Sequence, residues 1–219
     1  TGLSNLEEWT GAVWDSDPPA VSHIGFEFAK NIALKNPDKL VRYLRVWLGS
    51  TKIEKWFKDS TQYNLIVSAS NAANVPLYDY MLWMQGEENN TDTEAQYGAK
   101  FDTVVANLKL NTWFTNETEI IAKGLGSDYL DGGNENFLKS LNETNVLNAK
   151  YVSTIDLGDG IHVDGAEINE VARRMYNTID KTELGQSIFV RNASLGRVTL
   201  KNTSDFVGLG VTPTKRLII

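Results

Sequence analysis

The chain has 219 residues, a net charge of −7 and ordinary fractions of apolar and charged residues, which suit one globular α/β domain with at most a small appendage. The acidic balance and the lack of a basic stripe argue against nucleic acid and anionic membranes as partners. Cysteine is absent, which excludes disulfides, thiolate catalysis and cysteine metal sites, and no apolar run is long enough to predict membrane insertion.

Along the chain, helix and strand patterns alternate. The first 22 residues lack periodicity and contain the turn Asp17-Pro18-Pro19, so we interpret them as a loop. Helices are expected over residues 24–35 with Ser22 as the N-cap, within 60–73, from a capping box at Thr91 and Glu94 toward 110, over 134–141, and over 165–179. Strands are expected over residues 40–48, 77–84, 119–122 and 150–155.

This alternation predicts a parallel sheet with helices on both faces. In such sheets, functional sites form at the carboxyl ends of the strands. Three of the four predicted strand ends carry residues suited to a site: Gly49-Ser50, Gln85-Gly86-Glu87, and the loop with Asp159 and His162. Their coincidence predicts a site at that edge of the sheet.

The loop after the fourth strand contains one of only two histidines, His162, with Asp159 three residues before it. A histidine that acts as a general base needs a carboxylate on its far ring nitrogen, which fixes the tautomer and stabilises the imidazolium. The alternative is that the glycines only turn the chain and that Asp164 and Glu167 form an acidic helix start. A metal site is not expected, because no ligand-spaced cluster accompanies the histidines.

Three blocks of sequence resemble one hydrolase family. Residues 83–89 (W-M-Q-G-E-E-N), 46–56 (V-W-L-G-S-T-K-I-E-K-W) and 158–164 (G-D-G-I-H-V-D) resemble the Q-G-E, glycine and D-G-x-H blocks of SGNH (GDSL-like) hydrolases of the sialate O-acetylesterase and acetylxylan esterase type. The resemblance covers about residues 9–180, with the blocks in the family's order. It implies a flavodoxin-like, three-layer α/β fold with a parallel sheet and an esterase, with no cofactor, that removes acetyl groups from sugars.

The resemblance also implies roles for individual residues. His162 would be the base and Asp159 its orienting acid, with Glu87 as an alternative acid. The backbone N–H of Gly49 and the side-chain amide of Gln85 would form the oxyanion hole. Uncharged donors of this kind are what a developing oxyanion requires.

The nucleophile has two possible positions. The family's serine lies in a G-x-S-N block directly after the first, central strand, and Gly2-Leu3-Ser4-Asn5 has that form. Either Ser4 is the nucleophile and the strand is lost, or the true serine block lies upstream and the chain is a fragment. We favour the second alternative, because only Thr1 precedes the block and no strand can lead into Ser4.

The last part of the chain has a different texture. From Gly185, short alternating β segments are separated by turn residues, and this stretch is too short to bury its own core. Residues 207–219 resemble a motif near the ends of phage tail fibres and tailspikes, although an ordinary hairpin is the alternative. We therefore expect an esterase domain over residues 1–182 and a β-rich trimerisation or tail-fibre-like segment over 183–219. The resemblance implies a homotrimeric phage virion protein that acts on acetylated polysaccharide of the bacterial surface.

Two other functions compete with this prediction. A carbohydrate-binding domain could keep the fold without catalysis, since the serine is uncertain. An acetylxylan esterase of bacterial or plant type would have no connection to phage, and the β-rich tail argues against it.

Overall fold

The computed structural model describes residues 6–9, 23–125, 149–154, 156–157 and 165–179. Several predictions lie outside these ranges: Ser4, Asp159 and His162, the helix expected over 134–141, and the segment 183–219. These stay predictions. The described ranges contain the glycine block, the Q-G-E block and the elements that flank the D-G-x-H loop.

All described strands pair in parallel, in two sheets. The larger sheet has the order β3-β4-β5, formed by β3 (Tyr80–Trp83), β4 (Glu119–Lys123) and β5 (Ala149–Val152). In the smaller sheet, β1 (Leu6–Trp9) pairs with β2 (Val41–Leu44). The parallel arrangement is confirmed, but the single sheet that the alternation predicted is divided in two among the described residues.

The prediction of a loop over the first 22 residues is wrong at β1. This strand has only four residues, too few to show a hydrophobic period, and it is recognised by its pairing with β2. β2 and β3 are also shorter than the predicted strands over 40–48 and 77–84, because their outer residues belong to connecting loops.

The described α-helices lie close to their predicted positions: α1 (Ile24–Lys35), α2 (Thr61–Ala72), α3 (Glu94–Leu108) and α5 (Gly165–Asn177). Two caps differ from the predictions. His23 rather than Ser22 caps α1, since its Nδ1 accepts the N–H of Phe26 at 3.2 Å. The capping box of α3 is Thr93 with Gln96, not the predicted pair two residues earlier, because residues 89–92 form a turn in which the Asp92 N–H bonds the Asn89 carbonyl.

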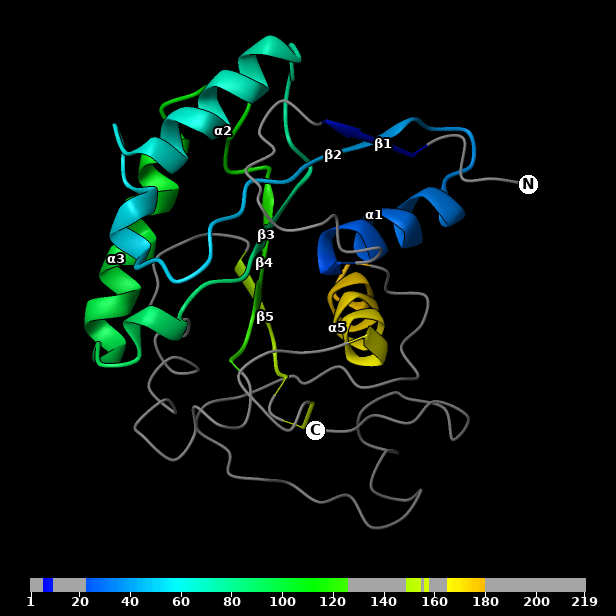
Figure 1. Ribbon diagram of the computed structural model, residues 1–219. Helices are drawn as coiled ribbons and strands as arrows, with labels where there is room; N and C mark the ends of the chain where they lie inside the picture. The colour runs from blue at the N-terminus through cyan, green and yellow to red at the C-terminus, as the bar shows by residue number, and fades with distance from the viewer. Residues whose placement is uncertain (1–5, 10–22, 126–148, 155, 158–164, 180–219) are drawn as a thin grey trace, which may run out of the picture.

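Helices cover both faces of the three-stranded sheet (Figure 1). On one face, α2 and α3 enclose a core in which Tyr97 and Phe101 pack with Trp83 and Ile120. On the other face, α1 and α5 pack together, and Phe28, Val171 and Met175 cover Ile121 and Val152. Neighbouring residues of β4 therefore face opposite cores, as the period of a strand requires. The predicted three-layer α/β arrangement is confirmed for the described residues.

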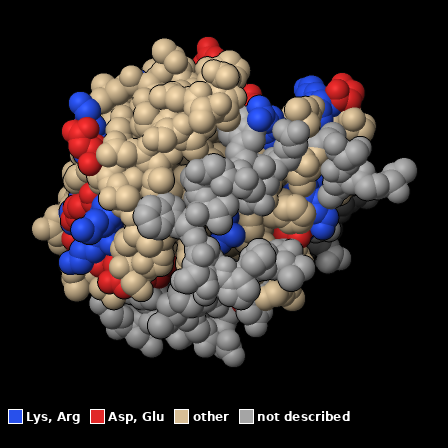
Figure 2. All heavy atoms as spheres, turned by 45° about the horizontal axis from the view of Figure 1, so that its top comes forward, with Lys and Arg blue, Asp and Glu red and all other residues tan. Residues whose placement is uncertain are grey.

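The carboxyl ends of β3, β4 and β5 meet at one edge of the sheet, where Gln85, Lys123 and Thr154 lie. The hydroxyl of Thr154 is 2.9 Å from the carbonyl of Gly124 and ties the ends of β4 and β5 together. No helix in the described ranges is long and apolar enough to cross a bilayer. On the face shown in Figure 2, acidic and basic groups lie side by side at the rim, and much of the remaining described surface carries neither.

Candidate functional site

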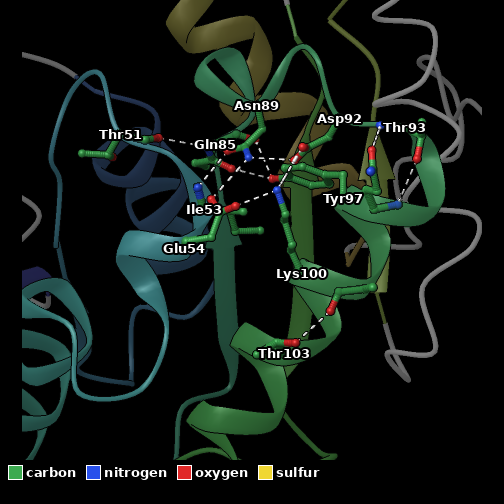
Figure 3. A network of polar contacts seen from close by, with 12 residues as sticks. Thr51, Ile53, Glu54, Gln85, Asn89, Asp92, Thr93, Tyr97, Lys100 and Thr103 are labelled. Atoms are coloured by element: carbon green, nitrogen blue, oxygen red, sulfur yellow. Dashed lines mark hydrogen bonds and ion pairs between the residues drawn. The ribbon is translucent and has the colours of Figure 1, made fainter.

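Gln85 follows the end of β3 and is buried, with 8% of its surface exposed. Its amide nitrogen donates to the carbonyl of Thr51 at 3.0 Å and to Oδ1 of Asn89 at 2.8 Å. Its amide oxygen accepts the hydroxyl of Tyr97 at 2.7 Å (Figure 3). Both N–H groups of the amide are therefore donated to protein acceptors, and the side chain joins the end of β3 to the glycine block.

Asn89 makes the second connection to the glycine block. It ends the 3-10 helix η3 (Glu87–Asn89) and is 5% exposed. Its Oδ1 accepts the backbone N–H of Ile53 at 2.8 Å as well as the amide of Gln85, and its Nδ2 donates to Asp92 at 2.8 Å (Figure 3). One buried amide thus links the glycine block, β3 and the turn that enters α3.

Tyr97 supports Gln85 from α3 and is almost fully buried. Its hydroxyl donates to Gln85 and accepts the indole N–H of Trp83 at 3.1 Å. Burial raises the pKa of Tyr97 well above its ordinary value, and the hydrogen bond from Trp83 opposes this shift only in part. The hydroxyl therefore stays protonated and acts as a neutral donor.

Lys100 closes the outer side of the same network. Its ammonium lies 2.6 Å from Glu54 of η2 (Ile53–Trp56) and 2.8 Å from Asp92. Burial alone would lower the pKa of Lys100, but the hydrogen bonds to Asp92 and Glu54 raise it. These pairs are partly exposed, so each adds little stability by itself, but together they tie η2 to α3.

Gly49 lies on an exposed bend two residues before Thr51. Ser50, not Gly49, has the left-handed backbone, with φ of 52°. A Cβ on Gly49 would meet only the ring of Trp47, at 3.5 Å, so neither strain nor crowding demands a glycine there. Within the described part of the chain, the Gly49 N–H has no hydrogen-bond partner. This N–H is therefore available to a ligand, whereas both N–H groups of the Gln85 amide are bonded to protein acceptors.

The sequence analysis missed Lys123, the last residue of β4. Its side chain is 8% exposed, and its ammonium donates to the carbonyl of Gly124 at 2.8 Å. Burial lowers the pKa of Lys123, and the charge of Glu87, the half-buried first residue of η3, acts in the opposite direction. A lysine directly after an apolar strand was the available signal, but a lysine at a strand end is usually solvated.

Of the six predicted site residues, the structure describes Gly49, Gln85 and Glu87, and it connects the first two through Thr51. Asp159, His162 and Ser4 lie outside the described ranges. No group of three histidine, aspartate or glutamate residues in the described ranges is placed to hold a metal ion.

Comparison with known proteins identifies a family. Residues 10–181 match the family described as carbohydrate esterase, sialic acid-specific acetylesterase. The chain is also similar to a crystal structure of a protein from Arabidopsis thaliana, with a TM-score of 0.66 and 19% identity over 82% of each chain. At this identity the similarity shows a shared fold. No curated protein sequence was found to match.

Proposed function

Because this chain belongs to the carbohydrate esterase family of sialic acid-specific acetylesterases and is therefore an ester hydrolase, we propose that it removes O-acetyl groups from a sugar by serine chemistry at the carboxyl edge of β3 and β5. His162 takes the proton of the serine hydroxyl as the oxygen attacks the acetyl carbonyl. The tetrahedral intermediate expels the sugar oxygen, which receives that proton. Water then hydrolyses the acetyl-enzyme by the same two steps.

The observation that carries the proposed site is the N–H of Gly49, which bonds no other residue that the structure describes and lies on a loop held by buried amides. A donor that is already oriented, and bonded to nothing else, stabilises an oxyanion without reorganisation. We assign this role to Gly49. Gln85 can add a second donor only by releasing the carbonyl of Thr51 or Oδ1 of Asn89, and both of these hydrogen bonds help to hold the glycine block in place.

The base is tested by His162→Ala. We expect the release of acetate from p-nitrophenyl acetate or an O-acetylated sugar to fall by roughly 10²- to 10⁴-fold, while circular dichroism shows an unchanged fold. Turnover close to that of the wild type would remove His162 from the mechanism. Asp159→Asn should lose most of the activity as well, and a much larger loss in Glu87→Gln would exchange the roles of the two acids.

The nucleophile is tested by Ser4→Ala and by an N-terminally extended chain. We propose that the serine block lies upstream, so the present chain should gain acetate release on extension and lose nothing in Ser4→Ala. Activity of the present chain that disappears in Ser4→Ala would assign the nucleophile to Ser4 instead. If neither chain releases acetate yet both bind acetylated sugar, the carbohydrate-binding alternative is favoured.

For the biological setting we propose a phage tail protein, a homotrimer through residues 183–219, that acts on acetylated polysaccharide at the bacterial surface. The support is the resemblance of residues 207–219 to a tail-fibre motif, together with the sugar esterase family. Light scattering on the full chain and on a chain that ends at residue 181 tests this proposal. We expect the full chain to be a trimer and the chain that ends at residue 181 to be a folded monomer. A monomeric full chain would contradict the tail-fibre interpretation.

A further inference from the structure

A tight turn follows β5 and leads directly into residues 158–164. The N–H of Leu157 bonds the carbonyl of Thr154 at 3.0 Å and closes the turn. Thr154 is fully buried, whereas the side chain of Asp156 in the turn is 52% exposed. The turn therefore carries the chain from the packed end of the sheet to the surface, three residues before Asp159 and six before His162.

Arg174, on the later part of α5, holds this turn. Its two terminal nitrogens donate to the two carboxylate oxygens of Asp156, at 2.6 and 2.7 Å, and one of them also donates to the carbonyl of Ser153 at 3.0 Å. Its Nε donates to Glu170 at 2.7 Å. The side chain of Arg174 is only 8% exposed, so this rigid fork has a fixed place under the turn.

Such an arrangement is poorly explained by stability alone. Burying a guanidinium costs desolvation free energy, and a well-packed apolar side chain often stabilises a protein as well as a buried ion pair does. What an arginine fork adds is direction, because a two-point contact fixes both the position and the orientation of the carboxylate. The contact also spans from the helix that follows the D-G-x-H loop to the turn that precedes it.

We propose that Arg174 is a positioning residue for catalysis: through Asp156 and Ser153 it sets where the chain enters residues 158–164, and so where Asp159 and His162 lie. This inference rests on the proposed function, which gives those two residues their roles. Arg174 itself touches neither substrate nor reacting atoms.

The chain offers a matched control at the opposite edge of the sheet. Lys150 of β5 also ties α5 to the sheet, with its ammonium 2.6 Å from Glu119 of β4 and 3.0 Å from the carbonyl of Thr178. It lies at the amino ends of the strands, away from the turn. Lys150→Gln therefore removes the ion pair between β5 and β4 and weakens the hydrogen bond to the residue after α5, without touching the entry to residues 158–164.

The test uses the N-terminally extended chain, which holds the proposed serine block, with p-nitrophenyl acetate as substrate. It compares five variants: Arg174→Gln, Arg174→Lys, Asp156→Asn, the double variant of Arg174→Gln with Asp156→Asn, and Lys150→Gln. We expect kcat per folded molecule to fall roughly 10- to 100-fold in Arg174→Gln and Asp156→Asn, because small displacements of catalytic groups are costly. KM should change little. The double variant should be no worse than either single variant, Arg174→Lys should lie between Arg174→Gln and wild type, and Lys150→Gln should keep its kcat. Unchanged kcat in Arg174→Gln, or additive losses in the double variant, would overturn the inference.

A second readout does not depend on turnover. The chain has two histidines, so NMR resolves the imidazole signals of His162 with those of His23 as an internal reference. In Arg174→Gln and in Asp156→Asn, the imidazole chemical shifts of His162 should change as its surroundings are displaced, while those of His23 stay constant. Unchanged His162 chemical shifts in both variants would also overturn the inference. By contrast, full turnover in His162→Ala would refute the proposed function itself, whatever the Arg174 variants do.

Discussion

Tyr97→Phe removes one oxygen atom from the centre of the polar network. The hydroxyl lies between the amide oxygen of Gln85 and the indole N–H of Trp83, at 2.7 and 3.1 Å, in a position that water does not reach. Phenylalanine fills the same space, so no packing is lost. The variant isolates the effect of leaving two buried polar groups without their partner.

The expected cost follows from those two groups. A buried donor or acceptor that loses its partner costs about 1 to 3 kcal/mol, so the loss of the partner of two such groups in Tyr97→Phe should lower the free energy of unfolding by about 2 to 6 kcal/mol. The matched control is Tyr63→Phe. The hydroxyl of Tyr63 also makes two hydrogen bonds, to the Asn107 carbonyl at 3.2 Å and from the Asn111 amide at 3.1 Å. Both groups are partly exposed, so water can replace the hydroxyl and the cost should be only about 0.5 to 1.5 kcal/mol.

Urea unfolding of the two variants, and steady-state kinetics of the same variants in the N-terminally extended chain, provide the measurement. Because Gln85 holds the carbonyl of Thr51 beside Gly49, we expect kcat to fall roughly 10-fold or more in Tyr97→Phe. It should remain unchanged in Tyr63→Phe. Equal losses of stability in the two variants would refute the argument about burial. A normal kcat in Tyr97→Phe would refute the argument that the network positions the glycine block.

Three further predictions concern single groups. Gly49→Pro removes the N–H that bonds no other described residue, and it should lower kcat by roughly 10²- to 10³-fold. Gly49→Ala keeps this N–H, meets only ordinary contact with Trp47 and should stay active, so equal kinetics of the two variants at wild-type melting temperatures would exclude this donor. Hydrogen bonds from Arg174 lower the pKa of Asp156, so the unfolded state binds more protons and the free energy of unfolding decreases as pH falls below about 4. Urea unfolding of Asp156→Asn should show a smaller decrease over that pH range, and the same dependence on pH in variant and wild type would contradict the ion pair. Burial lowers the pKa of Lys123, so the free energy of unfolding of the wild type should increase as pH rises toward about 10.4, whereas that of Lys123→Met should not. If the free energies of unfolding of both proteins depend on pH in the same way, the ammonium of Lys123 is solvated.

The sequence predicted the elements better than the contacts between them. Apolar residues at helical spacing were sufficient to place α3 and α5, whose stripes include Phe101 and Val171. Parallel pairing followed from the alternation of strands and helices. β1 was missed because four residues have no measurable period, and the caps were displaced because several polar residues near each helix start could serve.

The site was predicted only in part, for a physical reason. The motif over residues 83–89 identified Gln85, and the glycine block identified Gly49. Their connection depends on two hydrogen bonds, from Gln85 to Thr51 and from Ile53 to Asn89, and each joins residues more than 30 positions apart in sequence. Nothing in a local pattern reveals which carbonyl a buried amide will bond. A motif therefore predicted a donor at Gln85, whereas the fold shows both of its N–H groups already occupied.

The glycine block and the turn before the D-G-x-H loop are both held by buried polar side chains. An exposed loop loses conformational entropy when it is ordered, and an oxyanion hole or a histidine base acts well only if that ordering precedes the reaction. In the glycine block, the buried amides of Gln85 and Asn89 bond backbone groups of Thr51 and Ile53, directly after the N–H of Gly49. Before the D-G-x-H loop, the buried guanidinium of Arg174 bonds the turn that leads into residues 158–164. In each case the polar side chain that bonds the backbone or the turn is itself buried in the scaffold. The hydrogen bonds of Gln85 therefore suit it better to hold the glycine block than to serve as a donor. An amide that left Thr51 or Asn89 to bind the oxyanion would loosen the glycine block at the moment when its position matters most.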